Sequence, residues 1–258
     1  MHRQIDLNAD LGESYGPWRM GDDATMLGLV SSANIACAGH AGDPEVMFHT
    51  LELAHQRGVM IGAHPGYADR EGFGRRIIPM SPPEIARMIA AQVGALQGVA
   101  ALCQAQVRYV KPHGALANLA ASDPETADAV VMAVSRLPGD LAVLAISGTA
   151  LEAAARRHGL PVFAEIFADR GYLANGQLVP RNQPGALIHD PLEASARLMR
   201  YLETGRMPTV EGPEIPLEVH SICVHGDNPH AVEMALHLRE ALQKAGIEIR
   251  GFLADRAQ

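Results

Sequence analysis

The sequence predicts one β/α barrel of seven strands, in a single domain that spans residues 1–258. Apolar runs of strand length alternate with helical patterns along almost the whole chain, which is typical of βα units in series. No GxGxxG or Walker sequence follows any of these runs, so a Rossmann or P-loop sheet is disfavoured. The expected strands cover residues 3–8, 33–37, 59–63, 107–111, 141–146, 162–167 and 221–225.

Capping signals mark the helices between these strands. An N-cap residue is followed by proline, which is favoured in the first helical turn, at Asp43-Pro44, Ser81-Pro82, Asp123-Pro124 and Asn228-Pro229. Two segments break the alternation. Asn175-Gly176 predicts a hairpin-like excursion within residues 170–183, and the glycine- and proline-rich residues 202–216 predict a surface loop.

The composition disfavours several classes of function. Of 258 residues, 48% are hydrophobic and 19% charged; the formal charge is −8 and no lysine- or arginine-rich run occurs. Neither nucleic acid nor an anionic membrane is therefore an expected partner. The cysteines, Cys37, Cys103 and Cys223, form no CxxC, which fits a reduced, cytoplasmic location. We expect no signal peptide and no apolar run of membrane-spanning length.

Polar side chains gather at the end of the first expected strand. Asp6, Asn8 and Asp10 are spaced by two, so a strand points them to one side, and Glu13 follows. Carboxylates this close repel unless a cation, a proton or a basic side chain lies between them. A solvated turn with an Asx hydrogen bond is the alternative. Because the strand is expected to be buried, the cluster favours a functional site.

Histidines follow four of the expected strands, each beside glycine or proline. They are His40, His64, His113 and His225. One such histidine alone is more often a hydrogen-bonded structural residue. In a barrel, however, chemistry collects where the strands end, so all four are expected to converge on one mouth.

Charged residues complete this expected mouth. Lys111 ends an apolar strand, where it either stabilises a developing oxyanion or forms a structural ion pair with the acidic cluster. The glycine-rich residues 69–76 carry Arg75 and Arg76, which indicate either anion binding by a mobile loop or a solvated surface loop. Asp6, Asn8 and Asp10 resemble the start of a calcium loop, but Leu11 and Pro17 occupy its glycine and glutamate positions. The sequence leaves open whether a metal is bound.

The expected site residues fall into two groups. The expected catalytic residues are Asp6, Asp10, Glu13, His64, Lys111, His113 and His225. The expected substrate-binding residues are Asn8, His40, Arg75, Arg76, Glu165, Asp169, Arg170 and Asp227.

Nine segments, spread from the first expected strand to the last, resemble one family. They are residues 6–13 (DLNADLGE), 32–43 (SANIACAGHAGD), 62–67 (GAHPGY), 72–76 (GFGRR), 109–116 (YVKPHGAL), 165–172 (EIFADRGY), 178–181 (LVPR), 184–186 (PGA) and 222–229 (ICVHGDNP). In order and spacing the sequence resembles the LamB/YcsF family, whose members are the A subunits of ATP-dependent 5-oxoprolinases.

This resemblance implies a fold and an activity. Family members have a β/α barrel similar to sugar deacetylases and related glycoside hydrolases. With the B and C subunits they open the lactam of 5-oxoproline (pyroglutamate) to give L-glutamate, coupled to ATP hydrolysis. The chain has no nucleotide-binding fingerprint of its own, so ATP is expected to be handled with the partner subunits.

The residues suggest roles in such a reaction. Asp10, Glu13 or His113 is expected to act as general base or to protonate the leaving nitrogen. Lys111 with His64 or His225 is expected to stabilise charge on the carbonyl oxygen. Arg75, Arg76 or Arg170 is expected to hold a carboxylate or phosphate.

Two other functions remain open. The chain is alternatively a metal-dependent amide or N-acyl deacetylase that acts alone, with a divalent metal as cofactor. It is alternatively a non-catalytic subunit that presents the substrate to its partners. The sequence also leaves open the oligomeric state and whether the substrate is 5-oxoproline or a related lactam.

Overall fold

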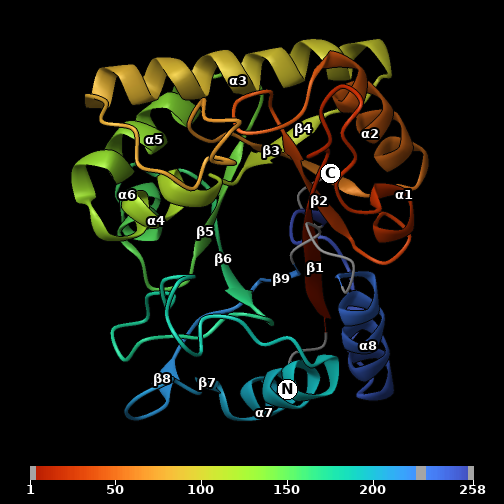
Figure 1. The fold of residues 1–258 in the computed structure, drawn as a ribbon, viewed down its shortest axis with the longest axis vertical. Helices are drawn as coiled ribbons and strands as arrows, with labels where there is room; N and C mark the ends of the chain where they lie inside the picture. Colours follow the sequence, from red (N-terminus) through yellow and green to blue (C-terminus); the bar gives the residue numbers. More distant parts are fainter. Residues whose placement is uncertain (1–3, 225–230, 255–258) are drawn as a thin grey trace.

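The computed structural model describes residues 4–224 and 231–254 of the 258-residue chain. Within them, parallel strands close into a barrel in the order β1-β2-β3-β4-β5-β6-β9, and β9 pairs back with β1 (Figure 1). The strands are β1 Gln4–Leu11, β2 Ser32–Ala36, β3 Met60–His64, β4 Val107–Val110, β5 Ala142–Ile146, β6 Val162–Phe167 and β9 Ser221–Val224. The prediction of a seven-stranded β/α barrel is confirmed. A short strand, β10 Glu248–Ile249, pairs beside the start of β1.

Helices surround the barrel. They are α1 Asp23–Met26, α2 Pro44–Gln56, α3 Pro82–Leu102, α4 Gly114–Ser122, α5 Pro124–Arg136, α6 Ala150–Arg157, α7 Pro191–Thr204 and α8 Ala231–Lys244. The predicted starts of α2, α3 and α5 are confirmed: Asp43 and Asp123 each accept a backbone N–H, and Ser81 forms a capping box with Glu84. The fourth predicted start, Asn228-Pro229, lies outside the described residues.

Helix α3 corrects one expectation. Its length and apolar composition would suffice to cross a membrane, so the expectation that no apolar run reaches that length is wrong. One face, which includes Ile85, Ile89 and Leu96, is buried, and the helix packs against α5 and α2 beside the barrel (Figure 1). In the described structure α3 is thus an amphipathic layer of the barrel.

The two predicted irregular segments differ in outcome. Around Asn175-Gly176 the chain turns back on itself, and an antiparallel bridge joins Tyr172 to Leu178, as predicted. The prediction that residues 202–216 form only a surface loop is wrong. Helix α7 runs to Thr204, and the short strands β7 Arg206–Met207 and β8 Ile215–Pro216 then form an antiparallel pair (Figure 1).

The strand β1 is longer than predicted, because it continues past Asn8 to Leu11. Its alternation places Leu7 and Ala9 in the apolar core. Asp6, Asn8 and Asp10 point to the opposite side, into the barrel, and are therefore stacked along its interior. Asp6, Asn8 and Asp10 are thus part of the strand, and Glu13 follows it.

The interior of the barrel is polar along this stack. Asp6 accepts hydrogen bonds from the hydroxyls of Ser31 at 2.6 Å and Ser32 at 2.5 Å, and from Ser221 as well. One level higher, the Asn34 amide donates to Asn8 at 2.7 Å and to Asp10 at 2.8 Å. Barrel interiors are more often filled by branched apolar side chains, so this column must be hydrogen-bonded to remain stable.

Aromatic rings close the end of the barrel below this column. Tyr109 packs edge-on to Phe252 with ring centroids 5.0 Å apart, and its hydroxyl donates to Asn34 Oδ1 at 2.6 Å. Gly62 makes this possible, because a Cβ there would lie 2.2 Å from the Tyr109 ring.

The buried Asp6 predicts a pH dependence of stability. Burial raises the pKa of Asp6 from its ordinary 3.8 to about 6, although the serine hydroxyls oppose this shift. Folded Asp6 therefore holds its proton more tightly than unfolded Asp6, and stability falls as the pH rises between these values. Relative to Asp6→Asn, the free energy of unfolding of the wild type should fall by roughly 2 kcal/mol from pH 4 to pH 7. Urea denaturation at several pH values measures this difference, with Asp140→Asn on the exposed surface as the control. Parallel curves for the wild type and Asp6→Asn would contradict it.

Candidate functional site

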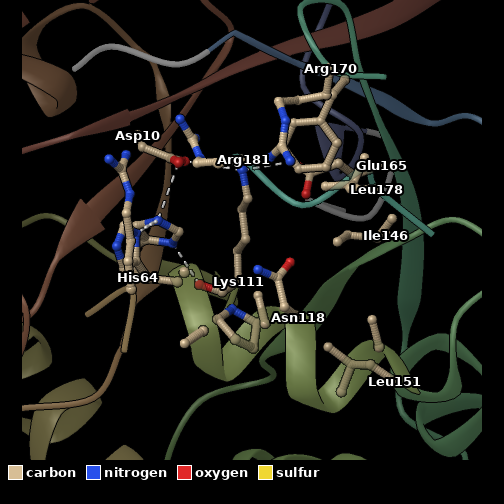
Figure 2. Close-up of a pocket in the computed structure, with 18 of the residues that line it drawn as sticks. Asp10, His64, Lys111, Asn118, Ile146, Leu151, Glu165, Arg170, Leu178 and Arg181 are labelled. Carbon is tan, nitrogen blue, oxygen red and sulfur yellow. Dashed lines mark hydrogen bonds and ion pairs between the residues drawn. The ribbon is translucent and has the colours of Figure 1, made fainter. Parts of the chain in front are cut away.

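The carboxyl ends of the barrel strands bring charged side chains to one mouth. Asp10 comes from the upper end of β1, His64 ends β3, and Lys111 follows β4. Glu165 comes from β6 and Glu13 from the turn after β1. In Figure 2, Lys111 extends through the middle of the pocket between Asp10 and Glu165.

Lys111 is the centre of this cluster. Its ammonium lies 3.0 Å from Asp10 Oδ1 and 2.7 Å from Glu165 Oε2. It also donates to Asn8 Oδ1 at 3.2 Å and to Cys223 Sγ at 3.1 Å. Burial by itself lowers the pKa of Lys111, but the carboxylates of Asp10 and Glu165 and the Cys223 thiol raise it well above its usual value. The ammonium is therefore charged and occupied by its own neighbours, which supports the ion-pair interpretation over the oxyanion role.

Two backbone carbonyls fix the tautomers of His64 and His113. His64 Nδ1 lies 2.7 Å from the Lys111 carbonyl oxygen, and His113 Nε2 lies 2.9 Å from the Phe73 carbonyl oxygen. Because a carbonyl can only accept, each of these nitrogens carries a proton. In neutral imidazoles, His64 Nε2 and His113 Nδ1 therefore carry lone pairs, and these two atoms face each other at 3.0 Å.

Carboxylates surround this pair of imidazoles. Asp10 Oδ2 lies 3.3 Å from His64 Nε2, and Glu13 Oε1 lies 3.6 Å from His113 Nδ1. His40 Nε2 lies 3.0 Å from the same Glu13 oxygen. One nitrogen or oxygen from each of Glu13, His40, His64 and His113 lies within 4.8 Å of the others, so these residues could hold a metal ion.

Burial keeps two of these histidines neutral. The pKa of His40 is lowered well below 6.5 by burial and then by His64, and the pKa of His113 is lowered by burial and then by His40 and His64. The rings of His40 and His113 are stacked with centroids 3.6 Å apart. Neutral imidazoles are the form that binds metals and accepts protons.

The loop of residues 69–76 covers the histidines. Phe73 has a φ of +54°, and its ring packs edge-on to His40 and His113, with centroids 5.4 and 5.2 Å away. Asp69 holds the loop by accepting from Gly72 N at 3.0 Å and Arg76 Nε at 2.9 Å. Arg76 lowers the pKa of Asp69 to about 2, so this carboxylate is charged near neutral pH.

A cavity of about 370 Å³ opens beside the cluster. One wall is the acidic and imidazole cluster, and the opposite wall is apolar, with Ile146, Leu151 and Leu178 (Figure 2). Three arginines, Arg75, Arg170 and Arg181, also line it.

The arginines repel one another. Arg170 is buried and donates from Nε to the Ala186 carbonyl at 3.0 Å and from Nη2 to the Val179 carbonyl at 2.7 Å. Burial and then the charge of Arg181 lower its pKa to about 10, and Arg75 adds to this effect. Like charges gathered at a cavity wall make it suited to an anion.

The structure brings together most of the predicted site residues. Eight of them line the cavity: Asp10, Glu13, His64, Arg75, Lys111, His113, Glu165 and Arg170. His40 lies behind Glu13, and Asn8 lies beneath Lys111. Asp6, Arg76 and Asp169 are not among the lining residues, and His225 and Asp227 lie outside the described residues.

Sequence reasoning did not select three residues that the structure places here. Arg181 and Asn118 line the cavity, and the Phe73 carbonyl orients His113. Arg181 belongs to the LVPR segment and Phe73 to the GFGRR segment, so both segments carried a signal. The role of the Phe73 carbonyl could not be predicted, because every residue type has a backbone carbonyl. Asn118 was not selected because it lies within helix α4, which the sequence analysis did not predict.

The fold and the site together define a β/α barrel with an acidic and imidazole centre at its mouth. Residues 5–257 match the model of the LamB/YcsF family, and the chain belongs to this family. It is 47% identical over 248 residues to the 5-oxoprolinase A subunit of Gluconobacter oxydans, a match that covers 96% of this chain and 98% of that protein.

Solved structures agree with the fold. A lactam utilization protein from Thermus thermophilus superposes with a TM-score of 0.90 at 42% identity, covering 96% of this chain and 99% of that one. The catalytic domain of a peptidoglycan N-acetylglucosamine deacetylase from Eubacterium rectale has a TM-score of 0.53 at 8% identity, over 97% of this chain and 89% of that one. The second comparison shows a shared fold only, which is the predicted deacetylase-type barrel.

The Lys111 cluster predicts a specific loss of stability. Lys111→Met leaves Asp10 and Glu165 buried without their cation, and the free energy of unfolding should fall by roughly 3–5 kcal/mol at pH 8. The loss of stability should be smaller at pH 5, because protonation of these carboxylates then removes the uncompensated charge. The double variant Lys111→Met/Glu165→Gln should recover part of the lost free energy of unfolding.

Urea denaturation at both pH values measures these effects. Arg157→Ala is the matched control, since it breaks an exposed ion pair with Asp128 at 2.9 Å and should cost less than about 1 kcal/mol. Equal losses for Lys111→Met at pH 5 and pH 8 would show that the charge is not the cause.

Proposed function

We propose that this chain is the A subunit of an ATP-dependent 5-oxoprolinase, which opens the lactam of 5-oxoproline to L-glutamate with the B and C subunits. The observation that carries the proposal is the cavity, in which three guanidiniums lie beside an acidic and imidazole wall. The near full-length similarity to a protein named as a 5-oxoprolinase A subunit supports it.

The chemistry explains why such a cavity is needed. A lactam is a poor electrophile, and transfer of the γ-phosphoryl group of ATP to its oxygen would activate the carbon and release ADP. One water then adds to this carbon, and the ring C–N bond breaks with nitrogen leaving as the amine. A second water releases phosphate from the resulting acyl phosphate, which leaves L-glutamate.

The residues divide between anion binding and proton transfer. Arg75, Arg170 and Arg181 are placed to bind the substrate carboxylate and the phosphoryl group. The wall formed by Asp10, Glu13, His64 and His113 is placed to activate water and to protonate the leaving nitrogen. Lys111 acts indirectly, through its ion pairs with Asp10 and Glu165.

ATP binding is assigned to the complex. The sequence contains no GxxxxGK[ST] segment, and the cavity of about 370 Å³ fits a small lactam with a phosphoryl group better than a whole nucleotide. We propose that the partner subunits supply most of the ATP site. A cytoplasmic location follows from this role, and the free thiols Cys37, Cys103 and Cys223 are consistent with it.

One other function has specific support. The His and Glu cluster would also suit a metal-dependent amide or N-acyl deacetylase that acts alone. Such an enzyme would need neither ATP nor partner subunits, which separates the two functions experimentally.

Glutamate release from 5-oxoproline tests the proposal. Purified chain alone should release none, and chain with the B and C subunits plus ATP should release glutamate and phosphate in equal amounts. Omission of ATP should abolish release. No release with partners shown to be competent with another A subunit would reject the proposed function, and ATP-independent release from an N-acyl substrate by the chain alone would favour the deacetylase.

Arg181 provides a test of anion binding. In the reconstituted complex, Arg181→Ala should raise the KM for 5-oxoproline by roughly 10–100-fold, the equivalent of one lost charged hydrogen bond. Arg206→Ala, on the exposed surface of β7, is the control and should leave KM unchanged. An unchanged KM in Arg181→Ala would remove this residue from the substrate contacts.

A further inference from the structure

We infer that a divalent transition-metal ion of the zinc class binds between His64 Nε2, His113 Nδ1 and the Glu13 carboxylate. The inference rests on the arrangement of these atoms. Only a role of the ion in catalysis rests on the proposed function.

The first argument is the direction of the lone pairs. The carbonyls of Lys111 and Phe73 take the protons of His64 Nδ1 and His113 Nε2, so the opposite nitrogens face each other at 3.0 Å without a proton between neutral rings. Two opposed lone pairs repel, and a cation that both nitrogens coordinate turns this repulsion into attraction. Metal-bound histidines characteristically donate their other N–H to a carbonyl in this way.

The second argument is distance. Ligands 2.0–2.1 Å from a tetrahedral zinc lie about 3.3 Å apart. His64 Nε2 and His113 Nδ1 are 3.0 Å apart, and His113 Nδ1 lies 3.6 Å from Glu13 Oε1. The ligand atoms of the group that Glu13, His64 and His113 form with His40 all lie within 4.8 Å of one another, so the three atoms can approach one ion.

The third argument is charge. Asp10, Glu13 and Glu165 are buried carboxylates in this cluster, and Lys111 is the ammonium buried among them. If all three carboxylates are ionised, two negative charges remain, while Arg75 has an exposed side chain and Arg170 lies across the cavity. A divalent ion would balance these charges.

The ligand types select the metal. Two imidazoles and one carboxylate suit zinc, cobalt or nickel, whereas magnesium and calcium prefer oxygen ligands alone. His40 is placed to orient the carboxylate, since its Nε2 lies 3.0 Å from Glu13 Oε1. Three protein ligands leave a fourth position for water or substrate, and a metal in such a site lowers the pKa of bound water.

Zinc binding to the full-length chain tests the inference. Protein stripped with a chelator should take up one zinc ion per chain at pH 7.5, as measured by calorimetry and by elemental analysis after dialysis. X-ray absorption of the loaded wild type should show two imidazoles and oxygen ligands. Magnesium should not compete at tenfold excess.

Variants locate the ion. His64→Gln, His113→Gln and Glu13→Gln should each weaken zinc binding by more than about 100-fold, while His49→Ala, exposed on α2, should leave it unchanged. Asp69→Ala, which releases the loop that holds the Phe73 carbonyl, should weaken binding by about 10-fold. Circular dichroism identifies any variant that fails to fold. For such a variant, the X-ray absorption spectrum of the zinc-loaded wild type decides whether two imidazoles bind the ion.

Other outcomes overturn the inference. Absence of stoichiometric zinc at pH 7.5 would mean that a proton alone joins the two imidazoles. Undiminished binding in folded His64→Gln and His113→Gln would place the ion elsewhere. Neither outcome bears on the proposed reaction, which the release of glutamate by the complex tests separately.

Discussion

The rest of the site depends on the ion pairs that the Lys111 ammonium forms with Asp10 and Glu165. Lys111 follows β4 and reaches Asp10 on β1 and Glu165 on β6, so one charge joins three strands around the barrel. Removal of two carboxylates from water is costly unless a cation lies between them. Lys111 therefore stabilises the two carboxylates that it joins in the wall of the cavity.

The polar column below Lys111 fixes this geometry from underneath. Asp6 is surrounded by serine hydroxyls, and Asn34 links Asn8 to Asp10 one level higher. Directional hydrogen bonds define side-chain positions more narrowly than apolar packing does. The column thus delivers Asp10 to the mouth in one orientation, at the cost of a buried acid at its base.

The loop of residues 69–76 fixes the site from above. Asp69 holds the loop closed, and the Phe73 carbonyl sets the tautomer of His113. The side chains at the strand ends are therefore supported from both sides, by the hydrogen-bonded interior of the barrel and by the loop that Asp69 holds. This support on both sides pre-organises the side chains at the mouth of the barrel.

The sequence by itself determined the seven strands, the starts of three helices and the strand ends that carry reactive groups, because period, caps and turn residues are local signals. The sequence could not show which of the candidate residues reach the cavity. Asp6 and Asp10 share a face of β1, but four residues separate them by roughly 13 Å along the strand, so only Asp10 reaches the cavity. Arg75 and Arg76 are neighbours, yet one lines the cavity and the other binds Asp69. Arg181 and the Phe73 carbonyl enter the site from separate loops. Tertiary structure decided these points, because barrel closure and loop packing set depth and direction across distant parts of the chain.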